Sequence, residues 1–330
     1  MPKLSELGER RIIELIIENL DKFPKMSIPF GDDVAALPIN DELSAVLKTD
    51  MLVAKTDMPP GMSLQQAARK AVVMNISDFA AKGVKPIVLL TSLGLTRDFT
   101  EEDAIEIAKG LNSGAREYGA YIVGGDTGEA SDTIICCMVF GTAKPEALIT
   151  RSGAKPGDIL AVTGLFGKTA SGLKILLNGL KVPPKIRSVL LESVYMPRAR
   201  LKEGLALAGA NVATASIDSS DGLAVSLHEL RKMSKVGFRI TKMPIASEAE
   251  EFAEINGLNS DELALYGGEE YEIITTLRHD SWRKAGQAVR EAGGSLIRIG
   301  EVTEEAKIVF VRDGKEEIIP YRGWEHFKRT

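Results

Sequence analysis

The stretch Val212-Ala-Thr-Ala-Ser-Ile-Asp-Ser-Ser-Asp-Gly-Leu223 shows how this chain is organised. We expect a strand near Val212–Ile217, a turn of hydroxyl and acidic residues, and a helix from Leu223. Free backbone N–H groups at such a helix start suit a phosphate, and Asp218 and Asp221 suit its magnesium ion. The alternative is plain capping of the helix by the turn's own side chains.

Strands and helices alternate in the rest of the chain as well. In the first half, a strand at Leu43–Lys48 delivers Thr49-Asp50, and Ser63 and Gly83 delimit a helix over Leu64–Lys82. A short strand runs into Gly124-Gly-Asp-Thr127, and an apolar strand follows it. The first half is therefore predicted to be α/β or α+β with a mixed sheet, and the second half α/β.

Length and sequence composition predict two domains. At 330 residues the chain exceeds what one core usually serves, and prolines and glycines cluster near Lys144–Asp158. We expect an N-terminal domain over residues 1–147 and a C-terminal domain over residues 148–330.

Composition also excludes several classes of protein. The net charge of −5 gives no general attraction to nucleic acid or anionic lipid. Apolar runs such as Ile134–Phe140 are far shorter than the ~18 residues of a membrane span, and the start has no signal-peptide core. We expect a cytoplasmic protein that binds neither nucleic acid nor a membrane.

The cysteines and histidines favour oxygen-based chemistry. Cys136 and Cys137 are neighbours inside an apolar run, which fits two buried strand residues better than a disulfide. Three scattered histidines are too few for a zinc site or a histidine-based nucleophilic triad. Any metal should be oxygen-ligated, with magnesium as the first candidate.

Seven aspartates lie at the ends of the expected elements, mostly beside glycine. Each alone fits a turn or a helix cap, which is the commoner role of Asp near Gly. Together they are harder to explain, because carboxylates that point at one another repel unless cations lie between them. A shared magnesium cluster would explain the set, which is Asp32, Asp33, Asp50, Asp78, Asp126, Asp218 and Asp221.

Two local patterns have competing interpretations. Asp78 can pair with Lys82 one helical turn further on, but its neighbours are apolar or small, which favours a metal. Gly164-Leu-Phe-Gly-Lys-Thr169 looks like a phosphate loop, but Val162 stands where that motif needs its first glycine. We therefore expect Lys168 to be a surface residue at a helix start.

Seven short motifs follow one another along the chain. They are Gly31-Asp-Asp-Val-Ala35, Thr49-Asp50, Asn75-Ile-Ser-Asp-Phe-Ala-Ala-Lys-Gly83, Gly124-Gly-Asp-Thr127, Thr150-Arg-Ser-Gly-Ala-Lys-Pro-Gly-Asp158, Asp218-Ser-Ser-Asp-Gly-Leu223 and Gly267-Gly-Glu-Glu-Tyr-Glu-Ile273. In this order they resemble the thiamine-monophosphate kinases, a family of the aminoimidazole-ribonucleotide synthetase superfamily. The resemblance extends to the tail Gly323-Trp-Glu-His-Phe327.

The resemblance implies a fold, an assembly and a reaction. The N-terminal sheet would pair with its twin into a barrel across a homodimer, and ATP and several magnesium ions would lie in a cleft beside the C-terminal α/β domain. The reaction would be the ATP-dependent phosphorylation of thiamine monophosphate to thiamine diphosphate. The acceptor is already anionic, so the protein must mainly neutralise and align two like-charged partners.

The resemblance also implies roles for particular residues. Asp50, Asp126 and Asp218 would be catalytic, and Trp324 would stack on a thiamine ring. The metal positions would be Asp33, Thr49, Asp50, Asp78, Asp126, Asp218 and Asp221; the ATP contacts Gly125, Asp126, Arg151 and Ser220; and the substrate contacts Asp57, Glu269 and Trp324.

Three residues depart from the family pattern. Lys48 stands where many members have a hydroxyl residue that helps to hold a metal, so either one magnesium is missing or Lys48 contacts phosphate instead. Asp57 stands where a histidine is common, and Glu270 replaces an aspartate. Two alternatives therefore stay open: aminoimidazole-ribonucleotide synthetase activity, and a module that binds nucleotide without turnover.

Overall fold

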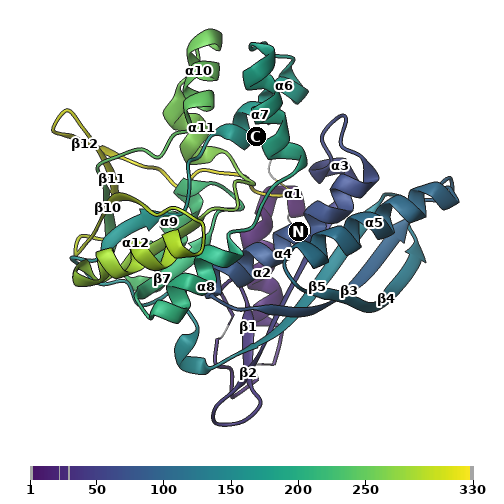
Figure 1. Ribbon diagram of the computed structural model, residues 1–330, viewed down its shortest axis with the longest axis horizontal. Helices are drawn as coiled ribbons and strands as arrows, with labels where there is room; N and C mark the ends of the chain where they lie inside the picture. Colours follow the sequence, from purple (N-terminus) through teal and green to yellow (C-terminus); the bar gives the residue numbers. More distant parts are fainter. Residues whose placement is uncertain (1–2, 22, 29, 328–330) are drawn as a thin grey trace.

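The computed structural model describes residues 3–21, 23–28 and 30–327, and its strands form two sheets (Figure 1). The first sheet has the order β1-β2-β5-β3-β4. Its neighbours run antiparallel except β3 and β4, which are parallel, so the sheet is mixed as predicted. The strands are β1 (Ala35–Pro38), β2 (Ser44–Val53), β3 (Pro86–Leu95), β4 (Tyr121–Glu129) and β5 (Ile134–Ala143).

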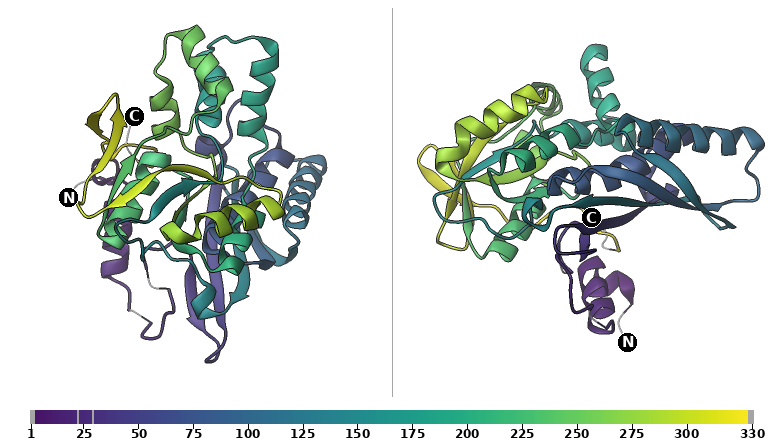
Figure 2. Two further views of the ribbon diagram at one scale, coloured as in Figure 1. Left: turned by 60° about the vertical axis from the view of Figure 1, so that its left-hand side comes forward. Right: turned by 60° about the horizontal axis from the view of Figure 1, so that its bottom comes forward.

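Two long helices cover one face of this sheet, and much of the other face is open, with the N-terminal helices on that side (Figure 2). Helix α4 (Leu64–Lys82) has the predicted bounds, because Ser63 forms a capping box with Gln66 and Gly83 ends the helix in a left-handed conformation. Helix α5 (Glu101–Glu117) begins at the capping box of Thr100.

Strand β2 is longer than predicted, and its length changes where the side chains of Thr49 and Asp50 point. It continues to Val53 instead of ending at Lys48, so Thr49 and Asp50 lie inside the strand. Consecutive strand side chains point to opposite faces of a sheet. Thr49 and Asp50 therefore cannot both face α4.

The short helices of the first half include a pair near the N-terminus. Gly8, at a φ of 76°, separates α1 (Leu4–Leu7) from α2 (Glu9–Glu18). Helix α3 (Ala54–Asp57) follows β2, and the 3-10 helix η1 (Pro145–Ala147) follows β5.

The second sheet has seven strands in the order β12-β11-β8-β10-β6-β9-β7. Only β8 and β11 pair in parallel, so this sheet is mixed and mostly antiparallel. All four residues of β6 (Ile159–Val162) are buried, because the sheet is covered on both faces. The other strands are β7 (Ala213–Asp218), β8 (Gly237–Ile240), β9 (Ile273–Leu277), β10 (Ile297–Thr303), β11 (Ile308–Arg312) and β12 (Lys315–Ile318).

Helices of the second half pack on both faces of this sheet and beyond its edge (Figure 1). They are α6 (Lys168–Asn178), α7 (Pro184–Tyr195), α8 (Leu201–Ala210), α9 (Leu223–Ser234), α10 (Ser247–Asn256), α11 (Ser260–Tyr266), the 3-10 helix η2 (His279–Ser281) and α12 (Trp282–Glu291).

The two halves share a core. The chain passes from the first sheet to the second between Ala143 and Ile159, and the predicted boundary at 147/148 lies in this connection. The cluster around α4 nevertheless includes Leu201, Tyr271 and Ile273 from the second half. Among the residues that the structure describes, no helix is long and apolar enough to cross a membrane.

Candidate active site

Helix α4 lies at the junction of the two halves, and four of its polar side chains define the site. Fifteen of its nineteen residues are buried, which is unusual for a helix with this many charged groups. Each of the four meets a group from elsewhere in the chain. They are Lys70, Ser77, Asp78 and Lys82.

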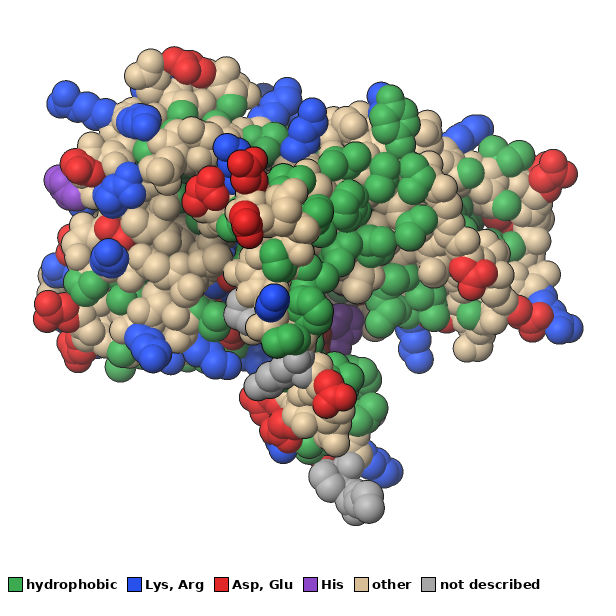
Figure 3. Space-filling model, turned by 90° about the horizontal axis from the view of Figure 1, so that it is seen from below, with side chains coloured by type: hydrophobic (Ala, Val, Ile, Leu, Met, Phe, Trp, Pro, Cys, Tyr) green, Lys and Arg blue, Asp and Glu red, His purple; other side chains and the backbone are tan. Residues whose placement is uncertain are grey.

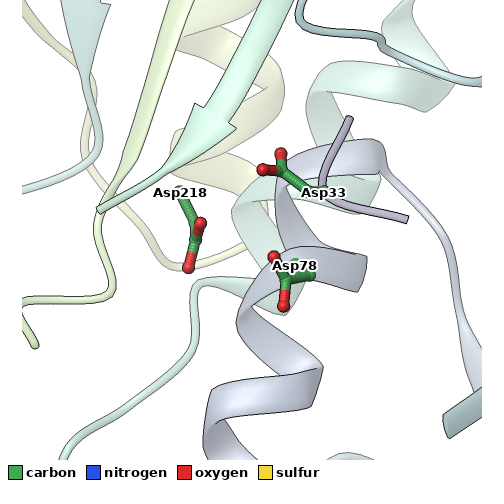
Figure 4. Close-up of side chains that lie close together, drawn as sticks. All are labelled: Asp33, Asp78 and Asp218. Carbon is green, nitrogen blue, oxygen red and sulfur yellow. The ribbon is translucent and has the colours of Figure 1, made fainter. Parts of the chain in front are cut away.

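Three of the predicted metal residues come together here. Carboxylate oxygens of Asp33, Asp78 and Asp218 lie within 4.8 Å of one another, and all three residues are buried (Figure 4). They come from the loop before β1, from α4 and from the end of β7. The Ser77 hydroxyl donates to Asp218 Oδ2 at 2.7 Å and so fixes the orientation of that carboxylate.

Cationic side chains surround this cluster. Lys48 Nζ lies 3.0 Å from Asp78 Oδ2, so this departure from the family pattern pairs with a predicted metal ligand. Lys82 Nζ lies 2.7 Å from both Asp32 Oδ1 and Asp33 Oδ2, and it donates to the carbonyl of Ser216. The alternative pairing of Asp78 with Lys82, which the sequence did not favour, does not form, because the lysine extends across to the loop at 32–33.

Burial is the largest influence on the pKa of each of the three clustered carboxylates, and the neighbouring charges add to it or oppose it. Burial would raise the pKa of Asp33, but Arg151 and Lys82 outweigh it and hold that pKa below its usual value. Burial raises the pKa of Asp218 to about 6, with Asp33 adding to the shift. Burial and the neighbouring carboxylates also raise the pKa of Asp78, even though Lys48 opposes them. A further cation would relieve this repulsion.

Thr49 and Asp50 point to opposite faces of β2. The Thr49 hydroxyl donates to the carbonyl of Cys137 at 3.1 Å, on the strand face away from α4. Asp50 lies on the α4 side, where its charge helps to raise the pKa of Lys48 against the effect of burial. The structure thus brings Asp50 toward the cluster and turns the Thr49 side chain away from it.

Asp126 and Gly125 lie on β4, the exposed edge strand of the first sheet. Two strands separate β4 from β2, a distance of about 14 Å at the usual strand spacing. Gly125 also has a packing reason to be glycine, because a Cβ there would lie 1.9 Å from the carbonyl oxygen of Thr91. Within one chain, these two residues are not brought to the aspartate cluster.

Arg151, Ser220, Asp221 and Trp324 line one cavity of about 450 Å³, together with Asp218 and residues of α2. Arg151 donates to Asp33 Oδ1 and to the carbonyl of Gly31, and its side chain stays 20% exposed. The backbone N–H of Trp324 donates to the carbonyl of Asp221 at 3.2 Å. This cavity therefore borders the aspartate cluster.

Helix α9 starts at this cavity without a cap. Gly222 precedes the helix at a φ of 107°, and among the described residues no side chain accepts from its first N–H groups. Burial, with Glu9 and Asp218 as further causes, raises the pKa of Asp221 beside it to about 7. The plain-capping interpretation of the turn at 218–221 is therefore wrong, and the free N–H groups can receive an anion.

Helix α6, where the sequence mimics a phosphate loop, is capped by Glu270. Oε1 of Glu270 accepts from the backbone N–H groups of Gly167 at 2.7 Å and Thr169 at 3.0 Å. The anion at this helix start is thus a side chain of the protein. The structure supports the rejection of the phosphate-loop motif and gives Glu270 a structural role.

Glu269 and Asp57 meet at Lys70. The Lys70 ammonium forms an ion pair with Glu269 and donates to the backbone carbonyl of Asp57 at 2.9 Å. The Asp57 carboxylate itself accepts from the backbone N–H of Val53 at 2.7 Å. Glu269 borders a different cavity from Trp324, so the three predicted substrate residues do not line a single pocket.

Lys70 and Ser77 had no role predicted from the sequence, and the sequence did not identify the partners of Lys82. The available signal was two lysines among the small and apolar residues of this helix, and their partners lie far away in the sequence. A buried lysine requires a partner. Nothing local in the sequence identifies that partner.

Comparisons with known proteins identify the family of the chain and a similar fold. The family models described as AIR synthase related protein, N-terminal domain and C-terminal domain match residues 31–143 and 155–313. The thiamine-monophosphate kinase of Pyrococcus horikoshii is 36% identical over 98% of each chain, and that of Escherichia coli K12 is 33% identical over 92% of each. A solved structure of AaThiL complexed with AMPPCP and TMP has a TM-score of 0.86 at 28% identity, covering 99% of each chain.

Proposed function

This chain belongs to the AIR synthase related proteins and, among them, to the thiamine-monophosphate kinase family, and from that premise we propose that it phosphorylates thiamine monophosphate with ATP. The product is thiamine diphosphate. The observation that carries the proposal is the uncapped start of α9 beside the buried carboxylates of Asp33, Asp78 and Asp218.

The chemistry needs little beyond placement and charge neutralisation. The acceptor is a phosphate monoester, which is anionic near neutral pH and needs no general base. N–H groups at the start of α9 can bind phosphate oxygens, and Arg151 offers a partly exposed guanidinium in the same cavity. The main barrier is the repulsion between two phosphate groups, which fixed positive charge lowers.

The donor set fits magnesium ions. It consists of carboxylate oxygens, which hard divalent cations prefer, and Asp33, Asp78 and Asp218 lie close enough together to share an ion. We propose that several magnesium ions bind here, with Asp33, Asp50, Asp78, Asp218 and Asp221 as ligands. Bound magnesium would neutralise phosphate charge.

The substrate contacts are proposed on the same basis. Ser220 and Arg151 would contact ATP, since they line the cavity at the start of α9. Asp57, Glu269 and Trp324 would contact thiamine monophosphate. Glu269 and Trp324 both lie next to the loop at 218–221, because the Ser220 and Asp221 carbonyls accept from their backbone N–H groups.

We further propose that the chain forms a homodimer through the open face of its first sheet. Figure 3 shows hydrophobic side chains gathered on that underside. Single exposed apolar residues are ordinary, but a contiguous patch marks an interface. Exposed apolar side chains of the sheet strands include Met51, Ile87, Leu90, Tyr121 and Val123.

The dimer would also complete the site. Strand β1 pairs with residues 44–47 of β2, and among the described residues no strand pairs with Thr49 and Asp50 on that edge or with the outer edge of β4, where Asp126 lies. In a barrel of two such sheets, Asp126 of one protomer would lie beside Asp50 of the other. Gly125 and Asp126 would then act in the partner's site.

Mixed dimers test that arrangement. Asp126→Asn and Asp218→Asn should each inactivate the homodimer. If the site is shared, a mixed dimer of the two variants keeps one intact site, and random mixing should restore about a quarter of wild-type turnover. If all residues act within one chain, the mixture should stay inactive.

The reaction itself is tested with purified protein, Mg-ATP and thiamine monophosphate, following thiamine diphosphate by chromatography. We expect product only when protein, ATP and magnesium are all present. Absence of product together with measurable ATP binding would contradict the proposal and favour a different acceptor or a binding module.

A further inference from the structure

Lys70 is a fully buried ammonium that the reaction as described does not use. It is 1% exposed, and its Nζ meets two groups from distant parts of the chain. One is the carboxylate of Glu269, and the other is the backbone carbonyl of Asp57 at 2.9 Å. Burying a charge in this way is unfavourable unless its partners are well placed.

The segment that carries Glu269 is held in a strained conformation. Glu269 and Tyr271 have φ values of 62° and 52°, in the left-handed region that non-glycine residues rarely adopt. Their backbone N–H groups donate to the carbonyls of Ser220 and Ser219. Gly268 permits this approach, because a Cβ there would lie 2.6 Å from the Ser220 carbonyl oxygen. Such strain persists where the surroundings fix it, and it gathers at functional sites.

Glu269 has room for a ligand on its other side. Its side chain is 24% exposed and borders a cavity of about 270 Å³ that also includes Met196 and Arg200. Lys70 approaches Oε1, which leaves the remaining lone pairs of the carboxylate directed elsewhere. The ion pair thus fixes the direction in which Glu269 can accept a hydrogen bond.

We propose that Lys70 is a positioning residue for the acceptor substrate. It ties the Glu269 carboxylate of one half of the chain to the Asp57 segment of the other, so that the thiamine moiety meets a carboxylate of fixed orientation. The inference rests on the proposed function, in which Glu269 contacts thiamine monophosphate.

The other lysines of the site, Lys48 and Lys82, have different partners from Lys70. Lys48 pairs with Asp78, and Lys82 pairs with Asp32 and Asp33, all at the aspartate cluster. Lys70 has neither set of partners. Its removal should therefore affect the acceptor more than ATP or magnesium.

The test compares Lys70→Met with Glu269→Gln and with the double variant. We expect Lys70→Met to raise the KM for thiamine monophosphate and its calorimetric Kd at least tenfold, with the KM for ATP within twofold of wild type. The double variant should bind thiamine monophosphate no more weakly than Glu269→Gln alone, because Lys70 acts through Glu269.

Lys82→Met is the matched control, since it removes an equally buried lysine from the same helix. We expect it to weaken magnesium and ATP binding, with a smaller effect on thiamine monophosphate. If Lys70→Met does not fold, Lys70→Arg and the double variant replace it in the comparison. The double variant leaves no unpaired charge. Melting temperature checks the folding of each variant.

The following results would contradict either the role of Lys70 or the proposed function. Equal changes in the KM of both substrates, or a lower melting temperature with unchanged binding of thiamine monophosphate, would reduce Lys70 to a structural residue. If Glu269→Gln itself leaves that binding unchanged, the inference fails while wild-type turnover still supports the proposed function. If wild type makes no thiamine diphosphate, the proposed function fails.

Discussion

The starts of α6 and α9 are two helix N-termini that follow strands of the same sheet but hold different things. At α6 the Glu270 carboxylate accepts from the N–H groups of Gly167 and Thr169. At α9 no described side chain caps the helix, and acidic residues flank it. A side chain of the protein accepts from the N–H groups at the start of α6, whereas we propose that a ligand does so at the start of α9.

The two helix starts show why a motif of glycine, lysine and threonine is weaker evidence for a phosphate site than the charged side chains that surround the helix start. Free N–H groups bind an anion at either helix, and only the surrounding side chains decide which anion it is. The following changes test the difference, beginning with the largest expected effect.

Asp50→Asn should lower turnover about a thousandfold, the scale expected when a charged group that acts on the transition state is lost. Asp50 faces the aspartate cluster, and asparagine keeps its size and its hydrogen bond to the backbone N–H of Met51. Steady-state kinetics and a thermal melt check both points. Exposed Asp41→Asn is the control. Wild-type turnover in Asp50→Asn would remove Asp50 from the site.

Lys48→Met should lower turnover between tenfold and a hundredfold, by the loss of a fixed cation near developing charge. If Lys48 replaces a magnesium ion beside Asp78, raised magnesium should partly restore the activity, because the freed carboxylate can bind it. If Lys48 contacts phosphate instead, the KM for ATP should rise and extra magnesium should not help. A variant with unchanged kinetics would contradict both interpretations.

Trp324→Ala should raise the KM for thiamine monophosphate about tenfold, the scale of a lost stacking contact, and affect ATP less. Trp324 is 43% exposed and shares a cavity with Arg151, so its partner is not fixed by position alone. Kinetics with each substrate varied in turn measure the split. Equal effects on both would remove Trp324 from the acceptor site.

Glu270→Gln should leave turnover within twofold of wild type and change only how stability depends on pH. Burial raises the pKa of Glu270 to about 7 from its usual 4.5, so the folded protein keeps this proton to higher pH than the unfolded chain. The stability from this group is present below pH 4.5 and is lost as pH rises through 7. Glutamine has no proton to lose and can still accept from both N–H groups.

The melting temperature of Glu270→Gln relative to wild type should therefore rise by a few degrees, on the order of 2–4 °C, between pH 5 and pH 8. Melting curves at four pH values measure it. A large loss of turnover in this variant would place the start of α6 in the active site and end the contrast with α9.

The sequence was sufficient to predict helix α4 but not the direction of its side chains. Ser63 and Gly83 are local signals, and the helix has the predicted bounds. The partners of Lys70 and Lys82 lie far away in sequence, so no local rule could find them. The gathering of Asp33, Asp78 and Asp218 was predicted from the number of aspartates at element ends and from the resemblance to the family, not from the position of any single one.

Thr49 shows a different limit. The motif Thr49-Asp50 resembles a loop of metal ligands, whereas the chain continues as a strand to Val53. Alternation along the strand then separates the two side chains. Asp126 lies on an edge strand of the same sheet, and whether it reaches a site depends on a second chain that the sequence of one chain does not describe.

The central claim is that the start of α9 holds the nucleotide phosphates while the acceptor binds beside them. Calorimetric titration of thiamine monophosphate into protein saturated with magnesium and a non-hydrolysable ATP analogue tests it most directly. The account predicts that one thiamine monophosphate binds per chain with the analogue still in place. Displacement of the analogue by thiamine monophosphate would mean a single shared pocket and would contradict the account.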